Sequence, residues 1–393
     1  MKTNRLLAVL LSSALMLAGC GSSDSSLGSA ADTTTTSAAA ESDERSYTRN
    51  SRFVETDDYP SLKELYKDRF LFGCAISTKV QETPEYTELA VQQFNSYTAE
   101  NAMKPEAVLM YSKAQADPEK YQDHAPITTK NIEACLEYAK ANGFAVRGHT
   151  LVWHSQTPDW FFYKNYDKDS GELADRDLML ARMENYIKDV LEWTNENYPG
   201  LIYAWDVVNE AADDGSGMRQ SLWYKTIGED FVAKAFEFAR KYAAPDVKLF
   251  YNDYNSYQTR KQNDILKFLK PIAEAGNLDG MGMQTHIGEY LNVSDYFKAM
   301  KKYHDELGVE IHITELDIGK NNTEDWELSQ GAYYAQFFTS LLAAIDEGVP
   351  VTSVTIWGLT DDMSWRTDEN ALIFNSDLSR KKAFDGIVSA IRK

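Results

Sequence analysis

Short β-rich runs alternate with longer helical runs along this chain, from Leu71 to the C-terminus. Strands that are joined by helical crossovers run in parallel, so the alternation requires a parallel sheet covered by helices. We count eight strand-like runs: LFGCAIS, FNSYTAEN, AVRGHTLVW, YAWDVVNE, KLFYNDYN, DGMGMQTH, EIHITELD and SVTIWGL. Eight such strands with outer helices close into a barrel, so the pattern predicts an α/β fold, a (β/α)8 TIM barrel in a single domain.

The helical runs between these strands are amphipathic. One of them, NIEACLEYAKANG, ends at Gly143, and glycine is typical of helix C-termini. Its apolar residues fall at i, i+3, i+4 and i+7, namely Ile132, Cys135, Leu136 and Ala139. A doubly wound open sheet is the alternative arrangement of such units. That fold usually carries a glycine-rich phosphate turn after an early strand, and LFGCAIS has none.

The start of the chain has the features of an export signal. Lys2 and Arg5 precede an apolar run from Leu6 to Leu17, which is too short to span a bilayer, and small residues follow it. The ending LAGC resembles the cleavage box of bacterial lipoproteins, which implies that Cys20 becomes an acylated N-terminus. We therefore expect an exported protein, lipid-anchored to a bacterial membrane at the cell surface. A secreted protein with a coincidental cysteine is the alternative.

Three regions are predicted from these patterns. Residues 1–19 are the signal peptide, residues 20–57 are a Ser/Thr-rich flexible tether with little to bury, and residues 58–393 form the barrel domain. The remaining cysteines are Cys74, in a strand pattern, and Cys135, on the apolar face of a helix pattern. We expect both to be buried free thiols.

Composition narrows the choice of partners. A formal net charge of −20 repels polyanions, so we expect no nucleic acid partner. No metal-ligand spacing such as CxxC or HExxH occurs in the sequence, and we predict neither a metal nor a cofactor. We also expect the protein to be a monomer.

Nearly every predicted strand begins apolar and ends in groups that are capable of chemistry. These groups are Glu100, Asn101, His149, Trp153, Asn209, Glu210, Asn252, Tyr254, Gln284, His286, Glu315, Asp317 and Trp357. The active site of an eight-stranded barrel lies at the C-terminal ends of its strands, so we expect these side chains to converge on one bowl. A carboxylate such as Glu210 at the end of an apolar strand is costly to bury unless it is paired or used.

Two carboxylates from different strands, with amides, imidazoles and indoles around them, indicate glycoside hydrolysis. One carboxylic acid protonates the leaving oxygen while the other carboxylate stabilises or attacks the anomeric carbon. Trp153, Trp357 and Trp365 suit stacking on sugar rings, and Trp365 lies in the loop TDDMSWR, away from any strand or helix pattern. Strict strand alternation would point Asn209 and Glu210 to opposite faces, so we expect that strand to end or kink there.

From about Tyr59 to Lys393 the chain resembles glycoside hydrolase family 10, the retaining endo-β-1,4-xylanases. The resemblance rests on strand-end motifs in the family's order: RGHTLVWHSQTPDW, WDVVNEA, LFYNDYN, MQTHI, ITELDI and IWGLTDDMSWR. It implies that xylan and xylo-oligosaccharides are the substrates.

The resemblance also implies a role for each matching residue. Glu210 would be the general acid/base, Glu315 the nucleophile, and Asn209 would contact the 2-hydroxyl of the sugar beside the nucleophile. His286 would hydrogen-bond Glu315, with Asp317 behind it to orient the imidazole. The glycone subsites would be lined by Glu100, Asn101, Lys104, His149, Trp153, Gln156, Trp357 and Trp365. Further substrate contacts would come from Gln284 and, near the aglycone side, from Asn252 and Tyr254.

The chemistry requires a protonated Glu210, and a nearby ionised Glu315 favours that form because like charges resist joint ionisation. Once Glu315 carries the glycosyl group its charge is gone, so Glu210 can then act as a base on water. Two other functions remain open from sequence. A β-glycanase acting on cellulose or mannan shares the barrel and the carboxylate pair. A sugar-binding lipoprotein that feeds a transporter is also possible, although such receptors usually have two lobes and a hinge.

Overall fold

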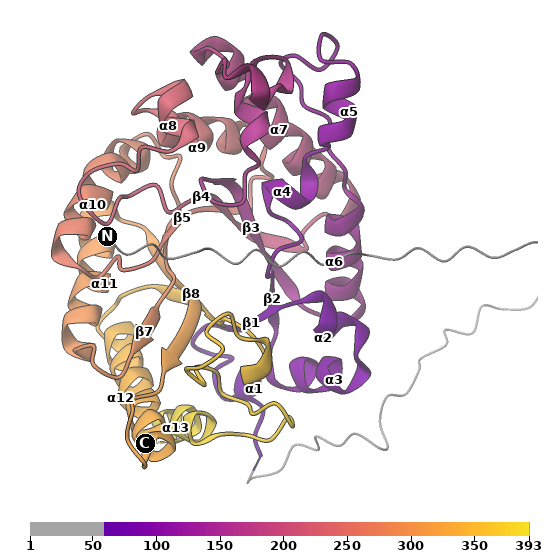
Figure 1. Cartoon of the computed structure of the whole chain (residues 1–393). Coiled ribbons are helices and arrows are strands. Elements are labelled where there is room, and N and C mark those ends of the chain that lie inside the picture. Colours follow the sequence, from indigo (N-terminus) through magenta and orange to yellow (C-terminus); the bar gives the residue numbers. More distant parts are fainter. Residues whose placement is uncertain (1–58, 393) are drawn as a thin grey trace, which may run out of the picture. The chain divides into compact units, whose positions relative to one another are not determined.

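The computed structural model describes residues 59–392, which form a parallel β-barrel surrounded by helices (Figure 1). The predicted signal peptide, Cys20 and the tether lie outside the described residues. The strands are β1 Leu71–Ile76, β2 Ser96–Ala99, β3 Ala145–Trp153, β4 Ile202–Asn209, β5 Lys248–Asp253, β6 Gly280–Met283, β7 His286–Gly288, β8 Glu310–Gly319 and β9 Val351–Ile356.

The sheet closes on itself. Its strands pair in the order β6-β5-β4-β3-β2-β1-β9-β8-β7, and β6 also pairs with β8. Every one of these pairings is parallel. The predicted (β/α)8 barrel is thereby confirmed, and the open doubly wound sheet is excluded.

The predicted strand at residues 279–286 is divided in two. β6 ends at Met283, Thr285 has a φ of 70°, and β7 begins at His286 and pairs with the end of β8. A β-branched residue rarely adopts this left-handed conformation. Thr285 Oγ1 donates to the Met283 carbonyl oxygen at 2.8 Å and lies 2.6 Å from Tyr296 Oη, and these contacts hold the turn. The barrel therefore has eight strands, with β7 as a short extension beside β8.

Helices cover the outside of the barrel (Figure 1). The α-helices are α1 Leu62–Leu65, α2 Thr78–Glu82, α3 Pro84–Gln93, α4 Pro105–Val108, α5 Tyr111–Ala116, α6 Lys130–Ala141, α7 Arg176–Asn197, α8 Leu222–Ile227, α9 Phe231–Tyr242, α10 Thr259–Glu274, α11 Val293–Leu307, α12 Trp326–Asp346 and α13 Lys382–Ile391. Short 3-10 helices are η1 Asp159–Phe162, η2 Lys164–Tyr166, η3 Lys168–Ser170 and η4 Asp361–Met363. Within residues 59–392, none of the helices combines the length and the hydrophobicity that a membrane span needs.

The main apolar core lies between the strands and the surrounding helices. Trp205 and Val207 of β4 are completely buried in it. Cys74 and Cys135 are buried there as free thiols, which confirms the prediction for both. The predicted helix before Gly143 is α6, and its four apolar positions all face this core.

The inside of the barrel is polar, and its charges are paired. Arg147 of β3 donates from Nε to Nδ1 of His312 of β8 at 3.2 Å and forms an ion pair with Asp206 of β4. β3 and β8 are not neighbours in the sheet, so these side chains cross the barrel. Asp206 also binds Nδ1 of His149 at 2.9 Å. The buried carboxylate of Asp206 therefore contacts both Arg147 and His149. A charged group that is removed from water requires such partners.

Gly280 in β6 leaves the space that the ring of Phe250 occupies. A Cβ atom there would lie 1.9 Å from Cε1 of that ring, which stacks on His312 with centroids 3.9 Å apart. We expect Gly280→Ala to lower the free energy of unfolding by about 1 to 3 kcal/mol, the usual cost of overpacking. Urea denaturation of the wild type, the two single variants Gly280→Ala and Phe250→Leu, and the double variant measures this effect.

In the Phe250→Leu background the added methyl group should cost less, because the smaller side chain can move aside. An equal cost in both backgrounds would show that the phenyl ring is not what excludes a side chain at Gly280.

Candidate active site

The polar strand ends meet in one cavity of about 620 Å³. It is lined by Glu100, Asn101, Lys104, His149, Trp153, Gln156, Asn209, Glu210, Tyr254, Asn255, Gln284, His286, Glu315, Trp357, Trp365, Arg366 and Glu369. All but two of the site residues predicted for the barrel are in this lining. The two exceptions, Asn252 and Asp317, lie beneath it and are completely buried.

Backbone geometry explains how Asn209 and Glu210 both reach the cavity. β4 ends at Asn209, and Glu210 adopts a left-handed conformation with a φ of 56°. Such a residue costs about 1 to 3 kcal/mol and persists only where its surroundings hold it. Here the Glu210 amide donates to the Asn252 carbonyl oxygen at 2.9 Å, and Arg219 Nε donates to the Glu210 carbonyl oxygen at 3.2 Å. The expected end or kink of the strand is therefore confirmed.

Three neutral donors surround the carboxylate of Glu210. Trp153 Nε1 donates to Oε2 at 3.0 Å, while Asn209 Nδ2 and Gln284 Nε2 donate to Oε1 at 3.1 and 2.9 Å. Gln284 lines the cavity as predicted, but its amide is also committed to Glu210. These contacts fix the direction of the carboxylate without placing a positive charge on it.

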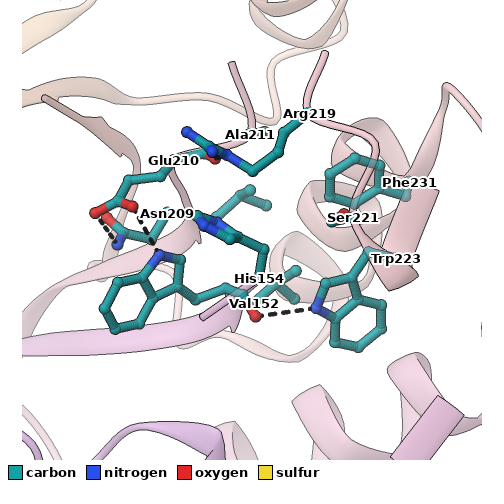
Figure 2. Close-up of a pocket in the computed structure, with 11 residues that line it drawn as sticks. Val152, His154, Asn209, Glu210, Ala211, Arg219, Ser221, Trp223 and Phe231 are labelled. Carbon is teal, nitrogen blue, oxygen red and sulfur yellow. Dashed lines mark hydrogen bonds between the residues drawn. The ribbon is translucent and has the colours of Figure 1, made fainter. Parts of the chain in front are cut away.

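His154 stands behind Glu210 and was not anticipated from the sequence. Figure 2 shows its ring near Arg219 and Glu210, at a small cavity of about 10 Å³ that has room for one water molecule. Within residues 59–392, Nδ1 of His154 finds no hydrogen-bond partner. Burial, together with the positive charges of Arg219 and Lys261, lowers the pKa of His154 to about 4. The imidazole is therefore neutral near pH 7, which avoids a charge that would favour ionisation of Glu210.

Glu315 is a buried carboxylate that is held ionised. Its side chain accepts from Asn252 Nδ2 at 2.7 Å and lies 3.1 Å from His286 Nε2. Burial alone would raise its pKa, but the hydrogen bond from His286, the charges of His149 and His286 and the bond from Asn252 lower the pKa of Glu315 to about 2. The group is therefore a carboxylate across the whole neutral range.

His286 joins Glu315 to a second carboxylate. Its Nδ1 lies 2.8 Å from Oδ2 of Asp317. Burial would lower the pKa of His286, but Asp317 and Glu315 raise it to about 10, so the ring is an imidazolium that donates to both acids. Asp317 also accepts from Trp365 Nε1 at 2.9 Å and from Arg366 Nη1 at 2.6 Å. Negative and positive groups therefore alternate from Glu315 to Arg366.

Asn252 lies elsewhere than we expected. The prediction placed it against the sugar on the aglycone side, but its side chain is completely buried. Its Nδ2 donates to Glu315 Oε1 and also to Asn209 Oδ1 at 2.9 Å, while its Oδ1 accepts from Thr314 Oγ1 at 2.6 Å. Asn252 of β5 pairs with Asn209 of β4 in the sheet, and these hydrogen bonds engage its whole amide with the protein. Asn252 positions other side chains and does not line the cavity.

Lys104 organises one end of the cavity. Its Nζ donates to Asn101 Oδ1 at 2.9 Å and to Gln156 Oε1 at 2.8 Å, and lies 4.8 Å from the ring centroid of Trp153. Burial lowers the pKa of Lys104, although nearby carboxylates oppose the shift. The lysine thus fixes an amide wall beside the indole, which is the arrangement that sugar hydroxyls and sugar ring faces need.

Two further indoles form the wall near Glu315. Trp357 is mostly buried and stands edge-on to His149, with ring centroids 5.4 Å apart. Trp365 is 60% exposed and stands edge-on to His286 at 4.9 Å. An indole this exposed serves no core, so it is free to contact a ligand.

Tyr254 stands at the other side of the cavity. Its hydroxyl accepts from Arg219 Nη2 at 2.9 Å and donates to Asp214. The same Arg219 holds the backbone of Glu210. The guanidinium therefore connects this wall to the turn that aims the Glu210 carboxylate.

Three lining residues were missed in the sequence analysis: Asn255, Arg366 and Glu369. Arg366 directly follows Trp365, and Asn255 follows Tyr254, so their neighbours in the motifs were the available signal. Across residues 59–392, no group of histidine, cysteine and acidic side chains has the arrangement of a metal site.

Comparison with known sequences agrees with this geometry. The chain matches the model of Glycosyl hydrolase family 10 over residues 61–390. Endo-1,4-beta-xylanase B of Butyrivibrio fibrisolvens is 46% identical over 341 residues, which are 84% of this chain and 53% of that protein. The chain thus spans about half the length of this curated relative.

Solved structures share the barrel. The N-terminal endo-1,4-beta-D-xylanase 10B of Clostridium thermocellum, solved with xylohexaose, is 34% identical with a TM-score of 0.77, over 84% of this chain and 67% of that chain. The intracellular xylanase of Thermoanaerobacterium saccharolyticum is 36% identical with a TM-score of 0.75, over 85% of this chain and 100% of that chain. Since the family model covers nearly all of the barrel, the chain belongs to glycosyl hydrolase family 10.

Proposed function

We propose that this chain is a retaining endo-β-1,4-xylanase that acts, as a monomer, on internal bonds of xylan and on xylo-oligosaccharides. The observation that carries the proposal is one cavity that holds two different carboxylates. Glu315 is kept ionised by a histidine and an amide, and Glu210 is held by neutral donors only. Family membership supports the same activity, and so do the names of two reported relatives, endo-1,4-beta-xylanase B and endo-1,4-beta-D-xylanase 10B.

In the first step, Glu315 attacks the anomeric carbon while Glu210 gives its proton to the leaving glycosidic oxygen. The bond to the aglycone breaks, and a glycosyl ester forms on Glu315. In the second step, Glu210 takes a proton from water, and the resulting hydroxide displaces Glu315 from the same carbon. Two inversions give net retention of the β-configuration.

The neighbouring residues prepare the two acids for these roles. His286 and Asp317 keep Glu315 charged and oriented, because a bare buried carboxylate would otherwise take up a proton. Asn209 lines the cavity, and its Oδ1 accepts from Gln284 and from the buried Asn252. Its amide is proposed to contact the 2-hydroxyl of the sugar bound beside Glu315.

Xylan is favoured over cellulose because xylose lacks the exocyclic hydroxymethyl group of glucose. Gln156 and Trp365 line the cavity, and Gln156 is fixed there by Lys104. If these two side chains border the glycone sugars, as the family resemblance implies, they occupy the space that the hydroxymethyl group of glucose would need. Such crowding costs about 1 to 3 kcal/mol, which is roughly tenfold to a few hundredfold in kcat/KM.

The alternative function, that of a sugar-binding lipoprotein that feeds a transporter, has less support. Receptors that feed transporters usually close two lobes around a hinge. Residues 59–392 form one closed barrel, with the paired carboxylates of a hydrolase in its mouth.

Replacing the two acids tests the proposed reaction. Glu315→Ala should abolish turnover, and Glu210→Ala should lower kcat about 10²- to 10⁴-fold unless the leaving group is good. With an activated aryl xylobioside, azide should then be captured as a β-glycosyl azide by the Glu210→Ala enzyme. NMR of the first product identifies its anomer, and reducing-sugar release compares xylan with cellulose and mannan.

Glu347→Ala is the matched control, since this acid is exposed and outside the cavity. It should leave both rate and product unchanged. An α-anomer as the first product would overturn the roles of both Glu210 and Glu315, and faster cleavage of cellulose or mannan than of xylan would overturn the substrate.

The contacts of His286 predict a pH effect. His286→Asn removes the imidazolium that lowers the pKa of Glu315, so burial should raise that pKa from about 2. Attack requires ionised Glu315, and the acid limb of the kcat/KM profile should therefore move to higher pH. Profiles on an aryl xylobioside between pH 3 and 9 measure the shift. His124→Asn, at an exposed ion pair with Asp189, is the control, and an unmoved acid limb in His286→Asn would contradict the assignment.

Export and anchoring are proposed from residues 1–20 alone. The apolar run and the LAGC box support lipid attachment to Cys20, which would hold the enzyme at the bacterial cell surface on a flexible tether. The intact chain should partition with membranes when it is expressed in a bacterium, and Cys20→Ala should release it. Recovery of the unchanged protein in the soluble fraction, starting at a residue other than Cys20, would refute the anchor.

A further inference from the structure

A second cavity of about 460 Å³ lies outside the active-site cavity. Its lining residues are Tyr111, Asp159, Trp160, Asp167, Lys168 and Asp169, none of which lines the first cavity. They come from the start of α5, from η1, and from η3 with Asp167, the residue before it. We call this cavity the α5 groove.

Two aromatic rings form one wall of the α5 groove. Tyr111 is 40% exposed, and its ring centroid lies 5.2 Å from that of Trp160 at an interplanar angle of 46°. Trp160 is half-buried and packs edge-on against Tyr166 at 5.4 Å. Exposed aromatic rings beside a hollow offer apolar faces, and such faces suit the C–H faces of sugar rings.

The loop that carries Trp160 is firmly braced. Arg182 of α7 is completely buried and donates to the carbonyl oxygens of Phe161, Tyr163 and Gln122 at 2.6, 2.9 and 2.7 Å. Its guanidinium also lies 4.0 Å from the ring centroid of Tyr166. The groove is therefore formed in advance, which reduces the ordering that a ligand must impose.

The charges at the rim favour an uncharged ligand. Asp159, Asp167 and Asp169 face the groove with a single lysine, Lys168, which pairs with Asp159 at 2.5 Å. The acids outnumber the base, so a polyanion is repelled. Carboxylates are strong acceptors for hydroxyl groups, so a neutral, hydroxyl-rich chain matches both the rim and the aromatic wall.

The α5 groove is built from the same two loops as one end of the active-site cavity. The loop after β2 supplies Lys104 to the cavity and Tyr111 to the groove, and the loop after β3 supplies Gln156 and then Asp159. Three residues span at most about 11 Å, so groove and cavity are close along this loop. The Glu106 amide donates to the Gln156 carbonyl oxygen at 2.9 Å and ties the two loops together.

We propose that the α5 groove binds an uncharged stretch of the xylan chain that extends past the Lys104 end of the active-site cavity. The inference rests on the proposed function, because it takes the substrate of that cavity as the ligand. A chain held at both places binds the second one at a high effective concentration, so the groove favours polymer over short substrates. One aromatic contact corresponds to about a two- to tenfold effect.

Tyr111→Ala tests the groove without touching the active-site cavity. It should raise KM for soluble xylan about two- to tenfold, leave kcat on xylan unchanged, and weaken retention in gels that contain xylan. Its kcat/KM on an aryl xylobioside, which has only two sugar units, should equal that of the wild type. Tyr111→Trp should keep the polymer KM, because it keeps an aromatic face there.

Leu328→Ala is the matched control, an exposed apolar side chain on α12 that lies outside both cavities, and it should change neither substrate. An unchanged polymer KM and gel retention in Tyr111→Ala would overturn the inference while xylobioside cleavage leaves the proposed function standing. Equal losses on both substrates would also overturn it. A wild-type chain that cleaves neither xylan nor aryl xylobioside would refute the proposed function itself, and the inference with it.

Discussion

A carboxylate that is buried in the mouth of a barrel takes up a proton unless its surroundings prevent it, and the arrangement around Glu315 prevents it. The imidazolium of His286 lies between Glu315 and Asp317, and Arg366 lies on the far side of Asp317. These four groups alternate in sign and cancel in sum. Glu315 is thereby held as a carboxylate by a neighbouring positive charge, although it is removed from water.

The second carboxylate is placed by the backbone. Glu210 leaves β4 in a left-handed turn, and without that turn its side chain would point away from Asn209. A series of amide side chains then connects the two acids. Asn252 donates to Glu315 and Asn209, and Gln284 donates to Asn209 and Glu210. The left-handed turn at Glu210 is strained and persists only where its surroundings hold it. This series of amide side chains is part of those surroundings.

Periodicity predicted the barrel and most of the residues that gather in its mouth. Strand ends such as those at Asn209, Gln284 and Glu315 could be placed together because parallel strands bring their C-termini to one face. The break in the strand at Thr285 could not be predicted from the sequence. Threonine does not indicate a left-handed turn, and the turn is held by Tyr296, a residue of a later helix. The Asn252 side chain is buried against Asn209 and Glu315 of other strands, and the sequence alone does not contain these contacts. His154 and Arg366 belong to the site through contacts between segments that are distant in sequence. The sequence motifs therefore indicated the residues beside them but not these two residues themselves. The chemical roles of the site residues stay predictions.

Trp365 has two roles, which connect the cavity wall to the groups behind Glu315. Its exposed ring forms part of the cavity wall, and its Nε1 donates to the buried carboxylate of Asp317. A smaller side chain in place of this indole would widen the cavity and would also withdraw a donor from the acid behind His286. The shape of the cavity wall and the hydrogen bonding of Asp317 therefore cannot be changed independently at this position.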